Sequence, residues 1–392
     1  FFCSLVVRQQ GAKMRRGFDY ISAAGLEELK NYKYHGSDKS IIANYVMQPF
    51  WRFVVEFLPL WLAPNLVTLL GFFAIVGSYL LLASFTPLIV GEAPSWVYLV
   101  MAACLFWYQT MDAIDGKQAR RTGTSSPLGE LFDHGCDAMT TVFMGLSLAC
   151  TMQLGTGWFS FFVTLTGYAV FFMAQWEEYF TGTMDLGYMG VTEIQLMVIG
   201  FYLVDYFSGP AFWLQELTVA GYTMPYNMVP TVFVLIGTTS TMASNIVTVA
   251  GMKKGAQPFV MLIPITWLCG GAFAWAYLSP ADISRLHPHE FFVTIGFMFA
   301  YITGRIVVNR VCGEPFNWLQ PILLGIPAAI AFCVLELDFV TEYQLLVGFM
   351  CLAIVQYLHF ALTVIDQMCT HLNIGCLHLT KEQIERNKKK SN

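Results

Sequence analysis

Apolar runs recur along the chain from residue 66 to residue 365, each close to the roughly 20 residues that an α-helix needs to cross a bilayer. Before them, residues 41–61 alternate aromatic and polar positions, which is typical of an amphipathic helix at the membrane interface. We therefore expect an all-α integral membrane protein with an interfacial helix in front of its spans. The pattern predicts ten transmembrane helices, over residues 65–84, 96–114, 132–153, 158–176, 191–208, 228–249, 258–278, 290–308, 318–335 and 343–365.

The composition also indicates a membrane protein, and the distribution of charged residues predicts how the chain is oriented in the membrane. The chain is 56% hydrophobic and 12% charged, with a mean hydropathy of +0.57, which is too apolar for a soluble protein of this size. Ten spans place both termini on one side of the membrane. Of the 21 lysines and arginines, all but Arg285 fall on that side. Because cytosolic loops carry an excess of Lys and Arg, we expect both termini in the cytosol.

One polar stretch, residues 112–137, interrupts the apolar pattern between the second and third spans. Asp112 and Asp115 are three residues apart, and Asp133 and Asp137 are four apart, so each pair shares a helix face. Four carboxylates directed at one point repel unless cations lie among them, and such oxygen ligands suit Mg²⁺ or Mn²⁺. A pair of these metals is an arrangement known for phosphoryl transfer. The alternative, that the aspartates only cap helices, is disfavoured because ionisable residues at membrane helices usually mark function.

Two neighbours of the aspartates fit a phosphorylated ligand. Gly116 follows the second aspartate and lets backbone or ligand approach closely, because it has no side chain. Arg120, one turn further on, suits two-pronged contact with a phosphate. The stretch therefore predicts a polar active-site cavity facing the cytosol.

The spacing of this stretch, D-x-x-D-G-x-x-A-R-x(8)-G-x(3)-D-x(3)-D, resembles the signature of the CDP-alcohol phosphotransferase family, and every fixed position matches. The resemblance implies that CMP is the leaving group and that an alcohol attacks the β-phosphate of a CDP-alcohol. It also implies two Mg²⁺ or Mn²⁺ ions held by Asp112, Asp115, Asp133 and Asp137. Substrate contacts are implied for Asn65, Gly116, Ala119, Arg120 and Gly129.

His134 borders the face that carries Asp133 and Asp137. Its imidazole suits a general base that takes the proton of the attacking hydroxyl near neutral pH. The alternatives are a structural imidazole held by neighbouring acids, with Asp137 as the base.

Residues 174–195 form the second unusual region, because this predicted cytosolic loop has acids and aromatics but no basic residue. Such a wall suits a quaternary ammonium through cation–π contact with Trp176 or Tyr179. The pattern W-x-x-Y, T-G, V-T-E-x-Q is similar to the choline/ethanolamine phosphotransferase branch of the family. The resemblance implies that Glu193 lies in the site and supports catalysis by orienting His134.

These observations predict an enzyme that transfers the head group of CDP-choline or CDP-ethanolamine to diacylglycerol, in membranes of the endoplasmic reticulum or Golgi. We expect membrane lipid around it, a possible homodimer and no nucleic-acid partner. The alternatives are a phosphatidylinositol or phosphatidylserine synthase of the same family and, from another class, a membrane transporter. Neither an arginine cluster for an anionic acceptor nor an inverted repeat is visible to favour them.

The chain divides into four predicted segments. For the C-terminal helices we expect a scaffold or dimer surface, with Arg305 and Asn309 as alternative contacts of the head group. The segments are a cytosolic and interfacial stretch over 1–60, the catalytic core over 61–210, further transmembrane helices over 211–367 and a charged cytosolic tail over 368–392.

Overall fold

A computed structural model of the chain describes the protein almost throughout and leaves out mainly its two ends. The residues described are 19–32, 36–37, 40–185, 190–219, 221–381 and 383–384.

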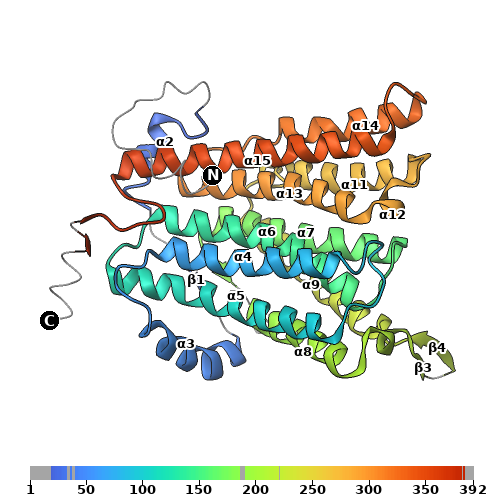
Figure 1. The fold of residues 1–392 in the computed structure, drawn as a ribbon. Helices are drawn as coiled ribbons and strands as arrows, with labels where there is room; N and C mark the ends of the chain where they lie inside the picture. Colours follow the sequence, from blue (N-terminus) through green and yellow to red (C-terminus); the bar gives the residue numbers. More distant parts are fainter. Residues whose placement is uncertain are drawn as a thin grey trace.

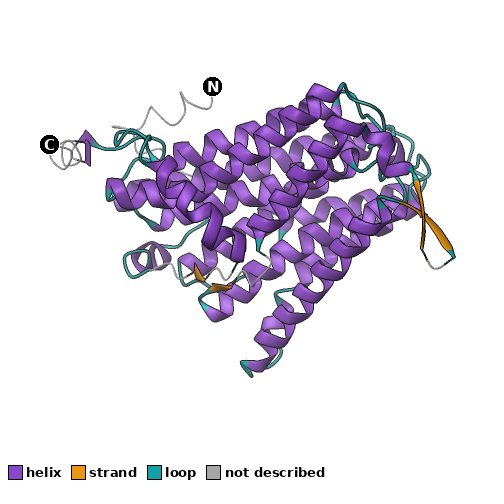
Figure 2. Cartoon of the chain, turned by 90° about the horizontal axis from the view of Figure 1, so that it is seen from below, coloured by secondary structure: helices purple, strands orange, loops and turns teal. Residues whose placement is uncertain are grey.

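Long helices run side by side through one bundle, as Figures 1 and 2 show from two directions. Among the described residues, eight helices are long and apolar enough to cross a membrane. The protein is a multi-pass membrane protein, as the hydropathy pattern predicted. These eight are α4 (Pro64–Ala83), α5 (Ser95–Thr122), α7 (Trp158–Thr181), α8 (Val191–Ser208), α9 (Met228–Gly251), α11 (Ile263–Leu278, preceded by α10, Gln257–Val260), α13 (Pro288–Val311) and α15 (Glu342–Leu372). A further long helix is α6 (Pro127–Thr151).

Two of the ten predicted spans are not among these eight. One corresponds to α6, whose first turns carry the second half of the motif. The polar residues of these turns lower the hydropathy of the helix. The other corresponds to a shorter apolar helix over Pro321–Val334, which consists of η3 (Pro321–Leu324) and α14 (Gly325–Val334). Together with the eight, these two elements give ten helical segments among the described residues, consistent with the number of spans predicted.

Several helices are longer than the hydropathy pattern predicted. We expected the second span to end at residue 114, but α5 continues to Thr122. We expected the fourth to end at residue 176, but α7 continues to Thr181. In both cases the added turns carry charged residues that lower hydropathy but do not end a helix. The expected loop over 174–195 therefore begins as helix.

The segment before the first long helix contains α2 (Ala23–Glu28) and then η1 (Ala43–Met47), which leads directly into α3 (Gln48–Val55). Trp51 and Val55 of α3 pack against Val67 and Ile114. On the other side of the same segment, Phe53 is 64% exposed. This distribution is the one an amphipathic interfacial helix requires.

Four short strands and two short helices were not predicted. Strand β1 (Gly36–Ser37) pairs in parallel with β2 (Met184–Asp185), joining the N-terminal segment to the loop after α7. Strands β3 (Glu216–Val219) and β4 (Tyr222–Pro225) form an antiparallel hairpin. Figure 1 shows this hairpin at the end of the bundle opposite α3. The short helices are η2 (Pro210–Leu214) and α12 (Ile283–Leu286).

Helix α13 lies at the centre of the bundle. Eighteen of its 24 residues are buried, and it packs against α6, α7, α11 and α15. Glycines let these helices approach closely: a Cβ on Gly296 would lie 2.5 Å from Val142, and one on Gly304 would lie 2.7 Å from Phe360. A helix of the C-terminal half is thus packed directly against α6, which carries half of the motif.

Candidate active site

The motif occupies the end of α5 and the beginning of α6, joined by a four-residue connection. Gly123 ends α5 in the left-handed conformation (φ 63°), and Pro127 occupies the first turn of α6. Helix α4 packs against both helices. The two halves of the motif are therefore held by three helices.

The structure brings the four motif aspartates together. The carboxylate of Asp112 interacts with those of Asp115, Asp133 and Asp137. Among the described residues, neither Oδ1 of Asp112 nor Oδ1 of Asp133 has a hydrogen-bond partner, although both atoms are buried. Burying several carboxylates without partners is costly. A set of clustered oxygen donors with free lone pairs fits divalent cations of the Mg²⁺ type.

Two neighbouring hydroxyl groups fix the outer edges of this cluster. Thr68 of α4 donates from Oγ1 to Oδ2 of Asp115 over 2.5 Å. Tyr108 of α5 donates from its phenol to Oδ1 of Asp137. Asn65, one turn before Thr68, is buried beside Gly129, where its Oδ1 lies 3.7 Å from the position of a Cβ. The start of the first span therefore lies against the motif.

The remaining motif positions lie on the α3 side of α5. Arg120 is exposed, and its guanidinium lies 3.7 Å from where a Cβ on Gly116 would be. The carbonyl of Ala119 accepts a hydrogen bond from the backbone of Thr124 at the end of the helix. Arg120 lines a cleft of about 470 Å³ together with Gln48, Arg52, Val55, Glu56, Lys117 and Arg121. An excess of cations makes this cleft attractive to phosphate groups.

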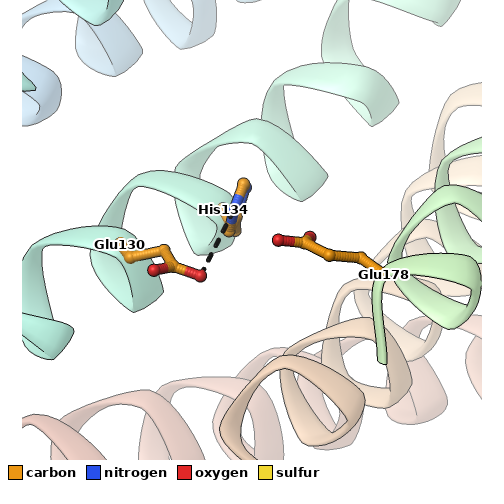
Figure 3. A group of neighbouring side chains, drawn as sticks. All are labelled: Glu130, His134 and Glu178. Atoms are coloured by element: carbon orange, nitrogen blue, oxygen red, sulfur yellow. Dashed lines mark ion pairs between the residues drawn. The ribbon is translucent and has the colours of Figure 1, made fainter. Parts of the chain in front are cut away.

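His134 lies between two acids of its own helix. Its Nδ1 is 3.7 Å from Oδ2 of Asp137, and its Nε2 is 4.0 Å from Oε1 of Glu130. The ring is buried, and neither ring nitrogen makes a hydrogen bond within the described part of the chain. Figure 3 shows the carboxylate of Glu178, from α7, directed at the same ring. Donor atoms of Glu130, His134 and Glu178 lie within 4.8 Å of one another.

The two glutamates beside His134 are joined by a residue that the sequence analysis missed. Arg310, near the end of α13, lies 2.7 Å from Glu130 and 2.8 Å from Glu178. The phenol of Tyr32 donates to Oε1 of Glu130 over 2.6 Å and accepts from Arg310 over 2.9 Å. Burial raises the pKa of Tyr32, so its phenol remains a donor at neutral pH. In the sequence, Arg310 was visible only as a charged residue at the end of an apolar span.

Glu193, expected to orient His134, is bonded elsewhere. It forms the N-terminal capping box of α8, where its Oε2 accepts from the backbone of Gly190 over 3.1 Å. Its Oε1 accepts from the side chain of Ser40 and from the backbone of Ile42. The acids that lie against His134 are instead Glu130, Asp137 and Glu178. A role for Glu193 in catalysis stays a prediction.

Trp176 and Tyr179, which were expected to contact the head group, both donate hydrogen bonds to backbone carbonyls of other segments. Trp176 is fully buried, donates from Nε1 to the carbonyl of Pro258 over 2.8 Å and packs against Phe180 and Phe259. Tyr179 donates to the carbonyl of Glu314 over 2.9 Å. Trp176 is two residues from Glu178 on the same helix, so these two side chains lie on nearly opposite faces of α7. This placement favours packing for Trp176 over contact with a cationic head group.

Comparison with known proteins agrees with the fold and the motif. Residues 61–233 match the family model for CDP-alcohol phosphatidyltransferase. The chain belongs to this family of membrane enzymes, which confirms the resemblance of its motif.

Its relatives narrow the comparison further. The chain is 35% identical to choline/ethanolaminephosphotransferase 1 of Arabidopsis thaliana, over 93% of this chain and 99% of the plant protein. It is 33% identical to cholinephosphotransferase 1 of Xenopus laevis, over 94% of each chain. It is 31% identical to cholinephosphotransferase 1 of Homo sapiens, over 93% of this chain and 92% of the human protein.

Proposed function

We propose that this protein transfers phosphocholine or phosphoethanolamine from CDP-choline or CDP-ethanolamine to diacylglycerol. The products would be phosphatidylcholine or phosphatidylethanolamine and CMP. The observation that carries the proposal is the complete motif, whose four aspartates meet in one half-buried cluster that contains two buried, unpartnered oxygens. Similarity to choline and ethanolamine phosphotransferases over nearly the whole chain supports the choice of substrates.

Asp112, Asp115, Asp133 and Asp137 would hold two Mg²⁺ or Mn²⁺ ions. When bound, these ions would neutralise the diphosphate of the CDP-alcohol and keep the attacking and leaving oxygens together. Thr68 and Tyr108 keep the outer carboxylates in place through their hydroxyl groups. Asn65, Gly116, Ala119, Arg120 and Gly129 are proposed to contact the substrate, with Arg120 supplying positive charge to a phosphate.

His134 is proposed to act as the general base. Its Nδ1 faces Asp137 and therefore the carboxylate cluster, whereas Nε2 faces Glu130. As the diacylglycerol oxygen bonds to the β-phosphorus, its proton moves to Nδ1 and the bond between phosphorus and the CMP oxygen breaks. The rival base is Asp137, whose carboxylate also belongs to the proposed metal site.

The distribution of Lys and Arg residues along the chain supports a cytosolic location for the proposed transfer reaction. In the predicted ten-span topology, every Lys and Arg residue except Arg285 falls on the side of the membrane that carries the motif. We propose that the motif end of the bundle faces the cytosol, in the endoplasmic reticulum or Golgi membrane.

The test is a product assay on purified protein in detergent with diacylglycerol, Mg²⁺ or Mn²⁺ and each CDP-alcohol in turn. Phospholipid should form with at least one of them, and a chelator or Asp112→Asn should abolish it. Parallel reactions with CDP-diacylglycerol and inositol or serine serve as the contrast. Product only in those reactions would overturn the proposed substrates, and activity that survives the chelator would overturn the metal site.

A further inference from the structure

Arg310 is a buried cation that joins the C-terminal half of the chain to the catalytic motif. Its side chain is 7% exposed, and its two terminal nitrogens point at different acids. One lies 2.7 Å from Glu130 of α6, and the other lies 2.8 Å from Glu178 of α7. These acids are themselves buried, with side-chain exposures of 8% and 1%. One guanidinium thus holds three helices of the bundle at one point.

Stability alone gives a weak reason for this cluster. Removing charges from water is costly, and buried ion pairs are often no more stabilising than apolar side chains of similar size. The cluster is also incompletely satisfied. Within the described residues, Oε2 of Glu130, Oε2 of Glu178 and both ring nitrogens of His134 lack hydrogen-bond partners. Such a group is more readily explained by work at a reacting site than by packing.

The cluster borders the ring of His134, with Glu130 at Nε2, whereas Asp137 of the proposed metal site lies at Nδ1. Glu130 lies one turn before His134 on the same helix, and its Oε1 is 4.0 Å from Nε2. Figure 3 shows Glu178 reaching the ring from the neighbouring helix. Two carboxylates and one guanidinium leave one net negative charge there. On the opposite side of the ring, Nδ1 lies 3.7 Å from Oδ2 of Asp137.

We propose that Arg310 is a positioning residue of the active site, which holds Glu130 and Glu178 against His134 so that Nδ1 faces the acceptor alcohol. The proposal rests on the proposed function, in which His134 is the base. Without Arg310, the two carboxylates repel each other and release the ring. Lysine would restore the charge but could not contact both acids with a rigid fork. The C-terminal helices, expected to be a scaffold, would then complete the active site.

The experiment compares Arg310→Met and Arg310→Lys with the wild type in the diacylglycerol transfer assay. Loss of a partner of a reacting group typically lowers activity about 10–100-fold. We expect a loss of this size in kcat for Arg310→Met, with KM for the CDP-alcohol and the Mn²⁺ dependence unchanged. Arg310→Lys should recover part of the loss. A change in KM or in Mn²⁺ dependence that accounts for the loss would overturn the proposal.

A double-mutant cycle with His134→Ala separates positioning from folding. If Arg310 acts through His134, adding Arg310→Met to His134→Ala should change the residual rate less than twofold. If Arg310→Met lowers the rate of His134→Ala as much as it lowers the rate of the wild type, then Arg310 acts independently of His134 and the proposal is overturned. If Arg310→Met does not fold, Glu178→Gln, which keeps the side-chain volume, takes its place in the same cycle. If the proposed function itself were wrong, the wild type would form no product, and this result differs from any outcome that overturns the role of Arg310.

Discussion

Thr68 is predicted to control how tightly the aspartate cluster binds its metal. It is buried on α4, and its Oγ1 donates to Oδ2 of Asp115 over 2.5 Å. A hydrogen bond to a charged group contributes about 1.5–3 kcal/mol. Since about 1.36 kcal/mol corresponds to a factor of ten, its loss should weaken metal binding about 10–100-fold. Thr68→Val removes the hydroxyl and keeps the shape of the side chain.

The assay is initial transfer rate against free Mn²⁺ at saturating CDP-alcohol. Thr68→Val should need a correspondingly higher Mn²⁺ concentration for half-maximal rate, with less change in the rate at saturation. Thr68→Ser retains the hydroxyl and is the matched control, expected to resemble the wild type. Equal Mn²⁺ dependence in the Val and Ser variants would refute the idea that this hydrogen bond orients a metal ligand.

Three further changes test other parts of the structure. Trp176→Leu should lower thermal stability and leave the ratio of KM values for CDP-choline and CDP-ethanolamine unchanged; a changed ratio would restore the head-group role. Gly296→Ala should cost about 1–3 kcal/mol of stability through overpacking, measured by thermal unfolding, whereas Gly145→Ala, which has open space around its Cβ position, should not. His134→Ala should lower kcat about 10²–10⁴-fold and keep CDP-alcohol affinity. Asp137→Asn should damage both, and a dead Asp137→Asn that binds normally beside an active His134→Ala would make Asp137 the base.

The aspartate cluster was predictable from the sequence because its geometry is local. Asp112 and Asp115 share one helix face, Asp133 and Asp137 share another, and a short connection returns the second helix beside the first. The hydropathy pattern likewise predicted the helical membrane fold. It could not show how far charged turns extend a helix, and this extension determined the placement of Glu178 and Tyr179 on α7.

The surroundings of His134 were not predictable from the sequence. Glu178 looked like one of several acids in a loop, and Arg310 looked like an ordinary charge at the end of a span. Their meeting depends on how α6, α7 and α13 pack, between residues that are up to 180 positions apart. No local spacing encodes that contact, and only the packed helices reveal it.

A CDP-alcohol labelled in both the cytidine and the head group follows the two products of the proposed transfer at once. The experiment uses purified protein in proteoliposomes with and without diacylglycerol, and is run with CDP-choline and CDP-ethanolamine in turn. We predict one CMP released for every phospholipid formed, neither product without diacylglycerol, and neither with Asp133→Asn. CMP release without diacylglycerol, or head-group label that crosses the membrane without release of CMP, would contradict the assignment of this chain as a phosphotransferase.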